Sequence, residues 1–412
     1  MESFPQPTLT ALLGQAVGDA FGAPFEFSPQ AQRHAQTSLH QKRYLDAVHD
    51  VGSRIRFSRI PGLYTDDTQQ ALVLLRAWMD LENPNDAAAV ALRFQSIITK
   101  MFDHWVKGSQ TGVHRGTGRN FRDAIMFGGP TNSAGVGAAM RIGPISTCFD
   151  SIDELLPWVV TVSRVTTTHP LALTGAGMFA AFCQGTAQGK SMDTILAQLH
   201  AWNPPADLDR AWSLNLEALS ILETRPEADL LIFAQATGAA NKTLGCAASG
   251  FALTTVPWTI HHAQQGSFSD VMAAVSKSGG DTDTVCAMAG CLAALRLGRG
   301  AIPQWMQHGL KGRESIDNPM QWDPIHSEKI LTEAEYQDQQ QRQKNGSSSE
   351  STPIAPQSLP TIWEEVISEK PAPNSALKTE DEQKQQPRQT AASEPETSTP
   401  NVPAKGQLGL FD

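Results

Sequence analysis

Apolar residues recur along this chain with the spacing of α-helices, and the alternating pattern of β-strands never persists. The expected fold class is therefore all-α, as a compact multi-helix domain. The helices that the pattern predicts span residues 8–24, 71–81, 86–105, 153–165, 171–185, 192–202, 209–222, 226–236, 247–256, 268–276 and 285–295. Residues 28–60 have little periodicity and are expected to be irregular.

The first helix carries a stripe of small residues. Gly14, Gly18 and Gly22 recur every four residues, so they share one helical face. Because glycine has no side chain, another helix can approach this face closely. Either Thr8 or Thr10 is expected to cap the start of this helix.

The composition changes near residue 338, where Gln, Ser, Pro, Glu and Lys replace apolar residues. Such a sequence cannot bury enough surface to offset its ordering entropy, so a disordered tail is expected. The predicted organisation is a folded domain over 1–335, a linker over 336–405 with an apolar island at 359–367, and a terminal peptide over 406–412.

Charge and composition exclude several classes of protein. The net charge of −10 argues against a general nucleic-acid-binding surface, which would be basic. The five cysteines are scattered without CxxC spacing, so they are interpreted as reduced core thiols rather than zinc ligands. The N-terminus has no signal-peptide pattern, and no apolar run reaches the length of a membrane span. A soluble cytoplasmic protein is expected.

Acidic and hydroxyl side chains cluster just before the helix expected at 285–295. Ser278–Thr284 places two carboxylates and two threonines behind paired glycines. One Asp could serve as an N-cap, but the cluster exceeds what capping needs. Crowded carboxylates are costly unless a cation neutralises them, and oxygen ligands select Mg²⁺, Mn²⁺ or Ca²⁺.

A second cluster, Thr65–Thr68, precedes the helix at 71–81 in the same way. Each cluster alone could be a cap, but two in one chain favour a shared cation site. Asp19 and Glu26 are further acidic residues near the first helix. For an isolated pair of this kind the favoured explanation is structural, with Asp19 as a local cap or ion-pair partner and Glu26 as a solvated loop residue.

Glycine is dense between residues 108 and 143. The segment Gly128–Gly137 could present backbone N–H groups to a phosphate, although it lacks the Lys-Ser/Thr of a P-loop. A surface loop is the commoner explanation of such a segment. His169 starts a helix beside three threonines, where it could be structural or could contact a ligand.

Five motifs, taken together, resemble the ADP-ribosylglycohydrolase family, which includes the dinitrogenase-reductase-activating glycohydrolases. They occur in family order over about residues 10–315. They are Gly14–Gly22 with Pro24 and Glu26, Tyr64–Thr68, Ala139–Arg141, Thr168–Pro170 with Gly175 and Ala176, and Gly279–Thr284.

The resemblance implies an Mg²⁺-dependent hydrolase that cleaves the glycosidic bond between ADP-ribose and an acceptor in a protein or a nucleic acid. It implies a centre of two Mg²⁺ ions, with Mn²⁺ as the alternative metal. The implied metal ligands are Thr65, Asp66, Asp67, Asp281, Asp283 and Thr284. Glu26, as a catalytic carboxylate or a gate, would act with Asp281 and Asp283 in catalysis. The implied ADP-ribose contacts are Ser133, Gly135, Gly137 and His169.

Two segments depart from the family pattern and leave the acceptor open. Val136-Gly137 stands where Asn-Gly is common, and Thr254-Thr255 stands where an acidic residue is often seen. Two other functions also stay open. The chain could be a catalytically silent ADP-ribose-binding scaffold, or it could hydrolyse another nucleotide-ribose conjugate.

The end of the chain has a resemblance of its own. Gln407, Leu408, Leu410 and Phe411 form a pattern similar to the peptide that binds the bacterial DNA polymerase sliding clamp. Such a peptide on a long tether could capture this partner, with its apolar residues in a cleft. This resemblance implies recruitment to replicating or repaired DNA.

Overall fold

The computed structural model describes residues 4–45, 61–102, 116–224, 227–238, 244–323 and 327. Within these ranges the chain forms helices and no β-strand, which confirms the all-α prediction. The helices are α1 (Gln6–Gly22), η1 (Ala23–Phe25), α2 (Ala31–Gln41), α3 (Asp66–Met79), α4 (Ala87–Phe102), α5 (Arg119–Met126), α6 (Gly137–Met140), α7 (Gly143–Ser146), α8 (Ile152–Ser163), α9 (Pro170–Ala187), α10 (Met192–Ala201), α11 (Asp209–Thr224), α12 (Glu227–Ala236), α13 (Ala252–Ala263), α14 (Phe268–Ser276), α15 (Thr282–Leu297), η2 (Arg299–Ala301), α16 (Gln304–Gly309) and α17 (Arg313–Asp317).

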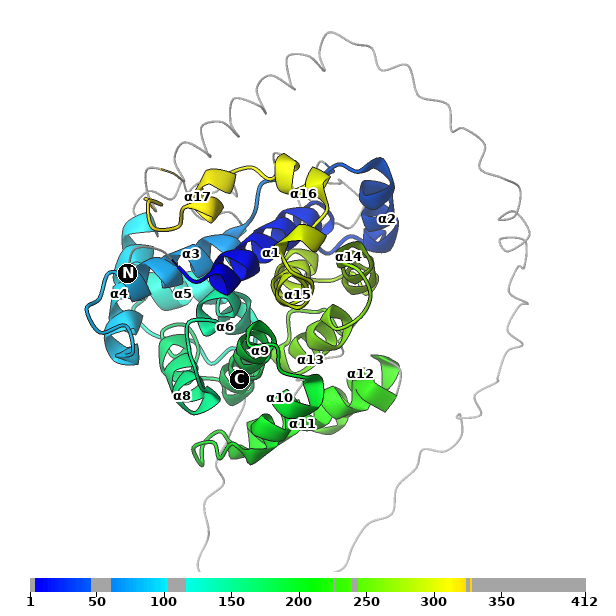
Figure 1. The fold of residues 1–412 in the computed structure, drawn as a ribbon. Helices are drawn as coiled ribbons and strands as arrows, with labels where there is room; N and C mark the ends of the chain where they lie inside the picture. Colours follow the sequence, from blue (N-terminus) through cyan, green and yellow to red (C-terminus); the bar gives the residue numbers. More distant parts are fainter. Residues whose placement is uncertain are drawn as a thin grey trace, which may run out of the picture. The chain divides into compact units, whose positions relative to one another are not determined.

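Helices α1 and α15 form the most extensive helix pair of the fold and lie side by side in Figure 1. The glycine stripe of α1 faces the backbone of α15, as its spacing predicts. A Cβ atom added at Gly14 would overlap the carbonyl oxygen of Gly290, and one at Gly22 would overlap that of Thr282. Only glycine permits so close an approach of two helix backbones.

The remaining helices pack around this pair. Helices α9 and α13 contact α15, helix α17 contacts α1, and helices α3, α7 and α14 contact both. Helix α15 is buried continuously from Thr282 to Ala294, so it forms the centre of the core. Its N-terminal residues, which carry the predicted acidic cluster, therefore lie where several helices meet.

Two expectations for the N-terminal region are wrong. Helix α1 begins at Gln6 after Pro5, and its N-cap makes no side-chain hydrogen bond. Thr8 is buried inside the helix, where its hydroxyl bonds that of Thr147 at 2.7 Å. The span 28–60 contains helix α2, whose few buried residues, Ala31 and Ala35 among them, are too small to produce a clear apolar pattern. Residues 46–60 lie outside the described ranges.

Helix α13 begins five residues later than the expected helix at 247–256. Residues before it form a loop in which the carbonyl oxygen of Ala247 accepts the hydroxyls of Thr254 (2.9 Å) and Thr255 (3.0 Å). Pro257 lies inside the helix rather than ending it. Thr254 and Thr255, which belong to a segment that departs from the family pattern, therefore stabilise this loop through the Ala247 carbonyl oxygen.

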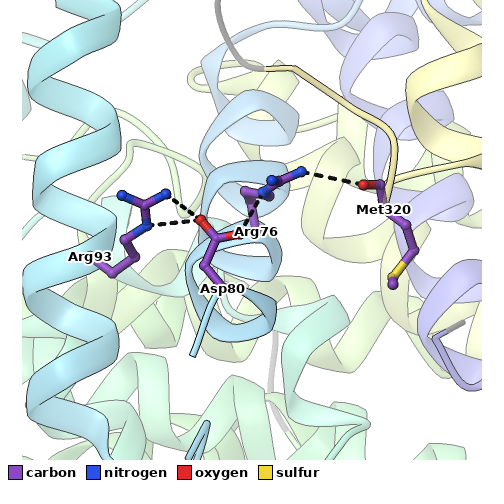
Figure 2. A network of polar contacts seen from close by, with 4 residues as sticks. All are labelled: Arg76, Asp80, Arg93 and Met320. Atoms are coloured by element: carbon purple, nitrogen blue, oxygen red, sulfur yellow. Dashed lines mark hydrogen bonds and ion pairs between the residues drawn. The ribbon is translucent and has the colours of Figure 1, made fainter. Parts of the chain in front are cut away.

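The far end of α3 is fixed by charged contacts, which Figure 2 shows. Asp80 accepts hydrogen bonds from the Nε of Arg76 (2.7 Å) and from Arg93 on α4. Arg76 also donates to the carbonyl oxygen of Met320 at 3.3 Å. These contacts connect α3 to α4 and to the C-terminal part of the described chain.

The predicted tail, with its linker, apolar island and terminal peptide, lies outside the described residues, so this organisation stays a prediction. Among the described helices, none is long and apolar enough to cross a membrane.

Replacing Gly18 with alanine should destabilise the fold. The new Cβ would overlap the carbonyl oxygen of Cys286, and a backbone atom cannot rotate away. Overpacking typically costs about 1–3 kcal/mol, and an overlap with backbone atoms places this change at the upper end of that range. After subtraction of the gain of about 1 kcal/mol from helix propensity, urea unfolding should show a net loss of about 2 kcal/mol.

The matched control for Gly18→Ala is Gly300→Ala, because a Cβ at Gly300 meets no atom within 4 Å. Equal stability of the two variants would contradict the close packing of α1 on α15.

Candidate active site

The first predicted acidic cluster occupies the N-terminus of α3. Thr65 is the N-cap, and its hydroxyl accepts the N–H of Asp67 at 3.4 Å and donates to the Asp67 carboxylate at 3.2 Å. Asp66 and Asp67 form the first turn and are both buried. The positive end of the helix dipole favours carboxylates at this position.

Asp19 of α1 completes this helix start from a distance. Its carboxylate accepts the N–H groups of Thr65 (2.8 Å) and Thr68 (3.1 Å) and the hydroxyl of Thr68 (2.6 Å). Burial and the nearby charge of Asp283 raise the pKa of Asp19 to about 6. The local cap expected for Asp19 is therefore wrong, because Asp19 caps a helix that begins more than forty residues later in the chain.

The second cluster occupies the N-terminus of α15. The Asp281 N–H donates to the carbonyl oxygen of Ala248 at 2.8 Å, and the Thr284 N–H donates to the Asp283 carboxylate at 3.0 Å. Gly280 has a φ of 76°, and a Cβ there would overlap the Ala248 carbonyl oxygen. Glycine is thus required immediately before the two carboxylates.

Glu26 joins this second cluster. Carboxylate oxygens of Glu26, Asp281 and Asp283 lie within 4.8 Å of one another, which is a spacing that could hold a metal ion. The N–H of Phe27 bonds the carbonyl oxygen of Gly280 at 2.6 Å, so the segment after α1 is fixed against the start of α15. Phe27 has a φ of 52°, an unfavourable backbone conformation for a bulky residue and one that is often found at functional sites.

The electrostatics of the clusters fit a divalent cation. Burial and the charges of Asp283, Asp19, Asp66 and Asp281 raise the pKa of Asp67. Burial, followed by the charges of Asp283 and Glu26, raises the pKa of Asp281. Within the described part of the chain, the buried Oδ1 of Asp67 has no hydrogen-bond partner. The carboxylates of this site repel one another, and one of their buried oxygen atoms lacks a hydrogen bond. Such a set of oxygen ligands is suited to Mg²⁺ or Mn²⁺.

A cavity of about 300 Å³ opens beside these carboxylates, a volume at the lower end of the range for small-molecule sites. One part of its lining is acidic, and the rest consists mainly of glycines, hydroxyls and amides. The described lining residues are Glu26, Phe27, Asp66, Asp67, Gln70, Gly116, Gly118, Asn120, Phe121, Thr131, Ser133, Gly135, Val136, Gly137, Ala138, Met140, Arg141, Thr166, Thr167, Gly250, Asp281, Asp283 and Thr284.

The predicted phosphate loop forms part of this lining. Ser133 accepts hydrogen bonds from Asn120 (2.8 Å) and from the N–H of Gly135 (3.3 Å). The N–H of Val136 bonds the carbonyl oxygen of Gly250 at 2.9 Å, which fixes the loop beside the start of α13. A Cβ at Gly137 would meet no protein atom within 4 Å, so this glycine leaves open space at the cavity wall.

Two predicted site residues lie outside this lining. The described lining includes neither Thr65 nor His169. His169 is the N-cap of α9, and its Nδ1 accepts the N–H of Leu171 at 3.2 Å. Burial lowers the pKa of His169, so its ring is neutral near pH 7. A contact between His169 and ADP-ribose stays a prediction.

Sequence reasoning did not assign a role to three polar residues that line the cavity, namely Gln70, Asn120 and Arg141. Gln70 follows Asp66 by four residues, the spacing of side chains that meet on one helical face, so its contact could have been predicted. Arg141 belongs to one of the family motifs, but the motif does not indicate its contacts. Nothing in the sequence around Asn120 indicates its bond to Ser133.

Comparisons with known proteins show the family of the chain. A family model described as ADP-ribosylglycohydrolase matches residues 6–342. The chain is 32% identical over 170 residues to the ADP-ribosyl-[dinitrogen reductase] glycohydrolase of Rhodospirillum rubrum, covering 40% of this chain and 52% of that protein. This match therefore spans about half the length of the relative.

A longer match is to the ADP-ribosylhydrolase ARH3 of Bos taurus, with 25% identity over 74% of this chain and 89% of that protein. A solved structure titled ADP-ribosylglycohydrolase-related protein complex shares the fold, with a TM-score of 0.50 and 23% identity over 76% of this chain and 95% of that one. Because the family model covers most of the sequence, the chain belongs to the ADP-ribosylglycohydrolase family of enzymes.

Proposed function

We propose that this protein is an Mg²⁺-dependent hydrolase that cleaves the glycosidic bond between ADP-ribose and an acceptor, thereby reversing ADP-ribosylation. The observation that carries the proposal is the convergence of Glu26, Asp281 and Asp283 within 4.8 Å at the wall of a cavity. Family membership supports the hydrolysis of ADP-ribose conjugates, and the relatives' names refer to this chemistry.

Two Mg²⁺ ions, or Mn²⁺ in their place, would be held by the two helix starts. The proposed ligands are Thr65, Asp66, Asp67, Asp281, Asp283 and Thr284. Such a pair, when bound, supplies positive charge that positions oxygen groups and favours deprotonation of water.

The chain's own residues would bind and orient the substrate. Backbone N–H groups of the loop around Ser133, Gly135 and Gly137 would donate hydrogen bonds to the diphosphate oxygens, and Gly137 leaves room for them. A water oxygen bonds to the anomeric carbon of the ribose while the bond to the acceptor breaks, through an oxocarbenium-like state. The carboxylate of Glu26 would accept the proton of the attacking water and would then pass this proton to the departing acceptor.

Replacing Asp283 with asparagine should abolish cation binding and most of the activity. The change keeps the side-chain shape but removes one charge from the cluster. Loss of residues that support a metal costs about 10–100-fold in affinity or activity, so loss of a ligand should reduce ADP-ribose release by about 100-fold or more. Added Mg²⁺ should raise the melting temperature of the wild-type protein and should not raise that of the variant.

The control for Asp283→Asn is Asp153→Asn, because Asp153 is an exposed residue in the first turn of α8. Full turnover in the Asp283 variant would show that the metal assignment is wrong.

The acceptor can be identified by release of ADP-ribose from a panel of substrates modified on Arg, Ser, Cys or a DNA base. We expect release from at least one substrate with Mg²⁺ and none after chelation with EDTA. Binding of ADP-ribose without release from any substrate would favour a silent binding protein. Release that persists in EDTA would rule out the dependence on a cation.

The terminal peptide suggests where this activity is delivered. We propose that Gln407, Leu408, Leu410 and Phe411 bind the bacterial sliding clamp, which would bring the hydrolase to ADP-ribosylated DNA or to proteins that act on it. These residues lie outside the described part of the chain, so the proposal rests on their sequence pattern.

Removal of residues 407–412 should abolish binding to the purified sliding clamp in a pull-down and leave ADP-ribose release unchanged. The double substitution Leu410→Ala and Phe411→Ala should have the same effect because it removes the apolar anchors. Lys405→Ala, just before the peptide, serves as the control. Unchanged clamp binding after the deletion would reject the proposal.

A further inference from the structure

Gln70 of α3 lies between the acidic clusters and a buried arginine. Its side chain is fully buried, and it lines the cavity. The Nε2 of Gln70 donates to the Oδ2 of Asp66 at 2.7 Å, and the Oε1 of Gln70 accepts from Nη1 of Arg141 at 3.3 Å. One amide thus contacts a carboxylate on one side and a guanidinium on the other.

The arginine fixes the orientation of this amide. A guanidinium has only donors, so the oxygen of Gln70 must face Arg141 and its NH₂ group must face Asp66. Arg141 cannot easily move, because it also donates to the Gly137 carbonyl oxygen (2.8 Å) and the Thr166 hydroxyl (2.7 Å). It is 1% exposed. Burial lowers its pKa to about 9, which still leaves it charged near neutral pH.

The carboxylate that Gln70 contacts needs such support. Asp66 is adjacent to Asp67 and adds to the negative charge that raises the Asp67 pKa. Repulsion of this kind favours rotation of a carboxylate away from its neighbours. A fixed N–H donor holds the carboxylate in place and offsets part of its charge.

We infer that Gln70 is a positioning residue that holds Asp66 in the orientation needed to bind the divalent ion, with Arg141 fixing Gln70 in turn. This inference rests on the proposed function, which makes Asp66 a metal ligand. The same arginine contacts Gly137 of the proposed ADP-ribose loop, so one network joins the metal ligands to the substrate loop. Partners that orient metal ligands in this way strongly affect metal affinity.

The test is Gln70→Met in the full-length, metal-free protein. Methionine has a similar length and helix propensity but cannot donate to Asp66. We expect Mn²⁺ affinity, measured by electron paramagnetic resonance and calorimetry, to fall by about 10-fold or more. Urea unfolding in EDTA should remain one cooperative transition, with a lower midpoint because the buried Arg141 loses the Gln70 oxygen as an acceptor. Saturating Mn²⁺ should restore part of the lost turnover.

Two further variants sharpen this test. Gln184→Met makes the same change at a buried glutamine of α9, whose Nε2 donates to the Asp150 carbonyl oxygen at 2.9 Å, and it should leave Mn²⁺ affinity unchanged. Gln70→Asn keeps an amide but is one methylene too short to reach both partners. This variant should weaken Mn²⁺ binding as well, and it provides the test of the inference if the Gln70→Met variant does not fold.

The outcomes separate this inference from the proposed function. If the wild-type protein binds Mn²⁺ and the Gln70 variants bind it equally well, the role of Gln70 is overturned and the metal centre stands. If the wild-type protein binds no Mn²⁺ at all, the metal centre itself is overturned, and with it the role of Gln70.

Discussion

The close contact between α1 and α15 is the constraint on which the site depends. Gly18 and Gly22 bring the α1 backbone against the carbonyl oxygens of Cys286 and Thr282, and the Thr282 hydroxyl bonds the Gly22 carbonyl oxygen at 2.9 Å. Because α1 ends beside the start of α15, Glu26 can lie next to Asp281. Glycines without any chemical function of their own thus determine which carboxylates can meet.

The close approach of these carboxylates causes electrostatic repulsion, which the fold offsets only in part. Two charges about 4 Å apart interact by about 4 kcal/mol at an effective dielectric constant near 20. In this site the carboxylate oxygens of Glu26, Asp281 and Asp283 lie within 4.8 Å of one another. Helix starts and N–H donors, such as those that Asp19 accepts from Thr65 and Thr68, favour the charged forms. The raised pKa values of Asp67 and Asp281 indicate that repulsion and burial still outweigh this support. A bound cation would remove most of the repulsion, so cation binding and the stability of this region should be coupled.

Much of the fold and of the acidic clusters could be predicted because the signals are local. Thr65 and Asp66 sit at the start of a periodic helix, and the glycine stripe has a regular spacing. What could not be predicted depends on contacts between segments distant in sequence. Asp19 caps α3 only because α1 packs against α3. The orientation of the Gln70 amide is fixed only because Arg141 lies beside it. Helix α2 escaped prediction because alanines carry its buried face.

The carboxylates that line the cavity also help to distinguish a site that only binds ADP-ribose from one that catalyses a reaction. A module that only bound ADP-ribose would gain nothing from five cavity-lining carboxylates, since they repel a diphosphate and destabilise the empty site. Donor groups alone, such as the N–H groups of the glycine-rich loop, would suffice for binding. Buried acids become favourable when a cation compensates for them and when the reaction develops positive charge at the sugar. The composition of this cavity therefore fits catalysis better than recognition alone, in agreement with the membership of the chain in a family of glycohydrolases.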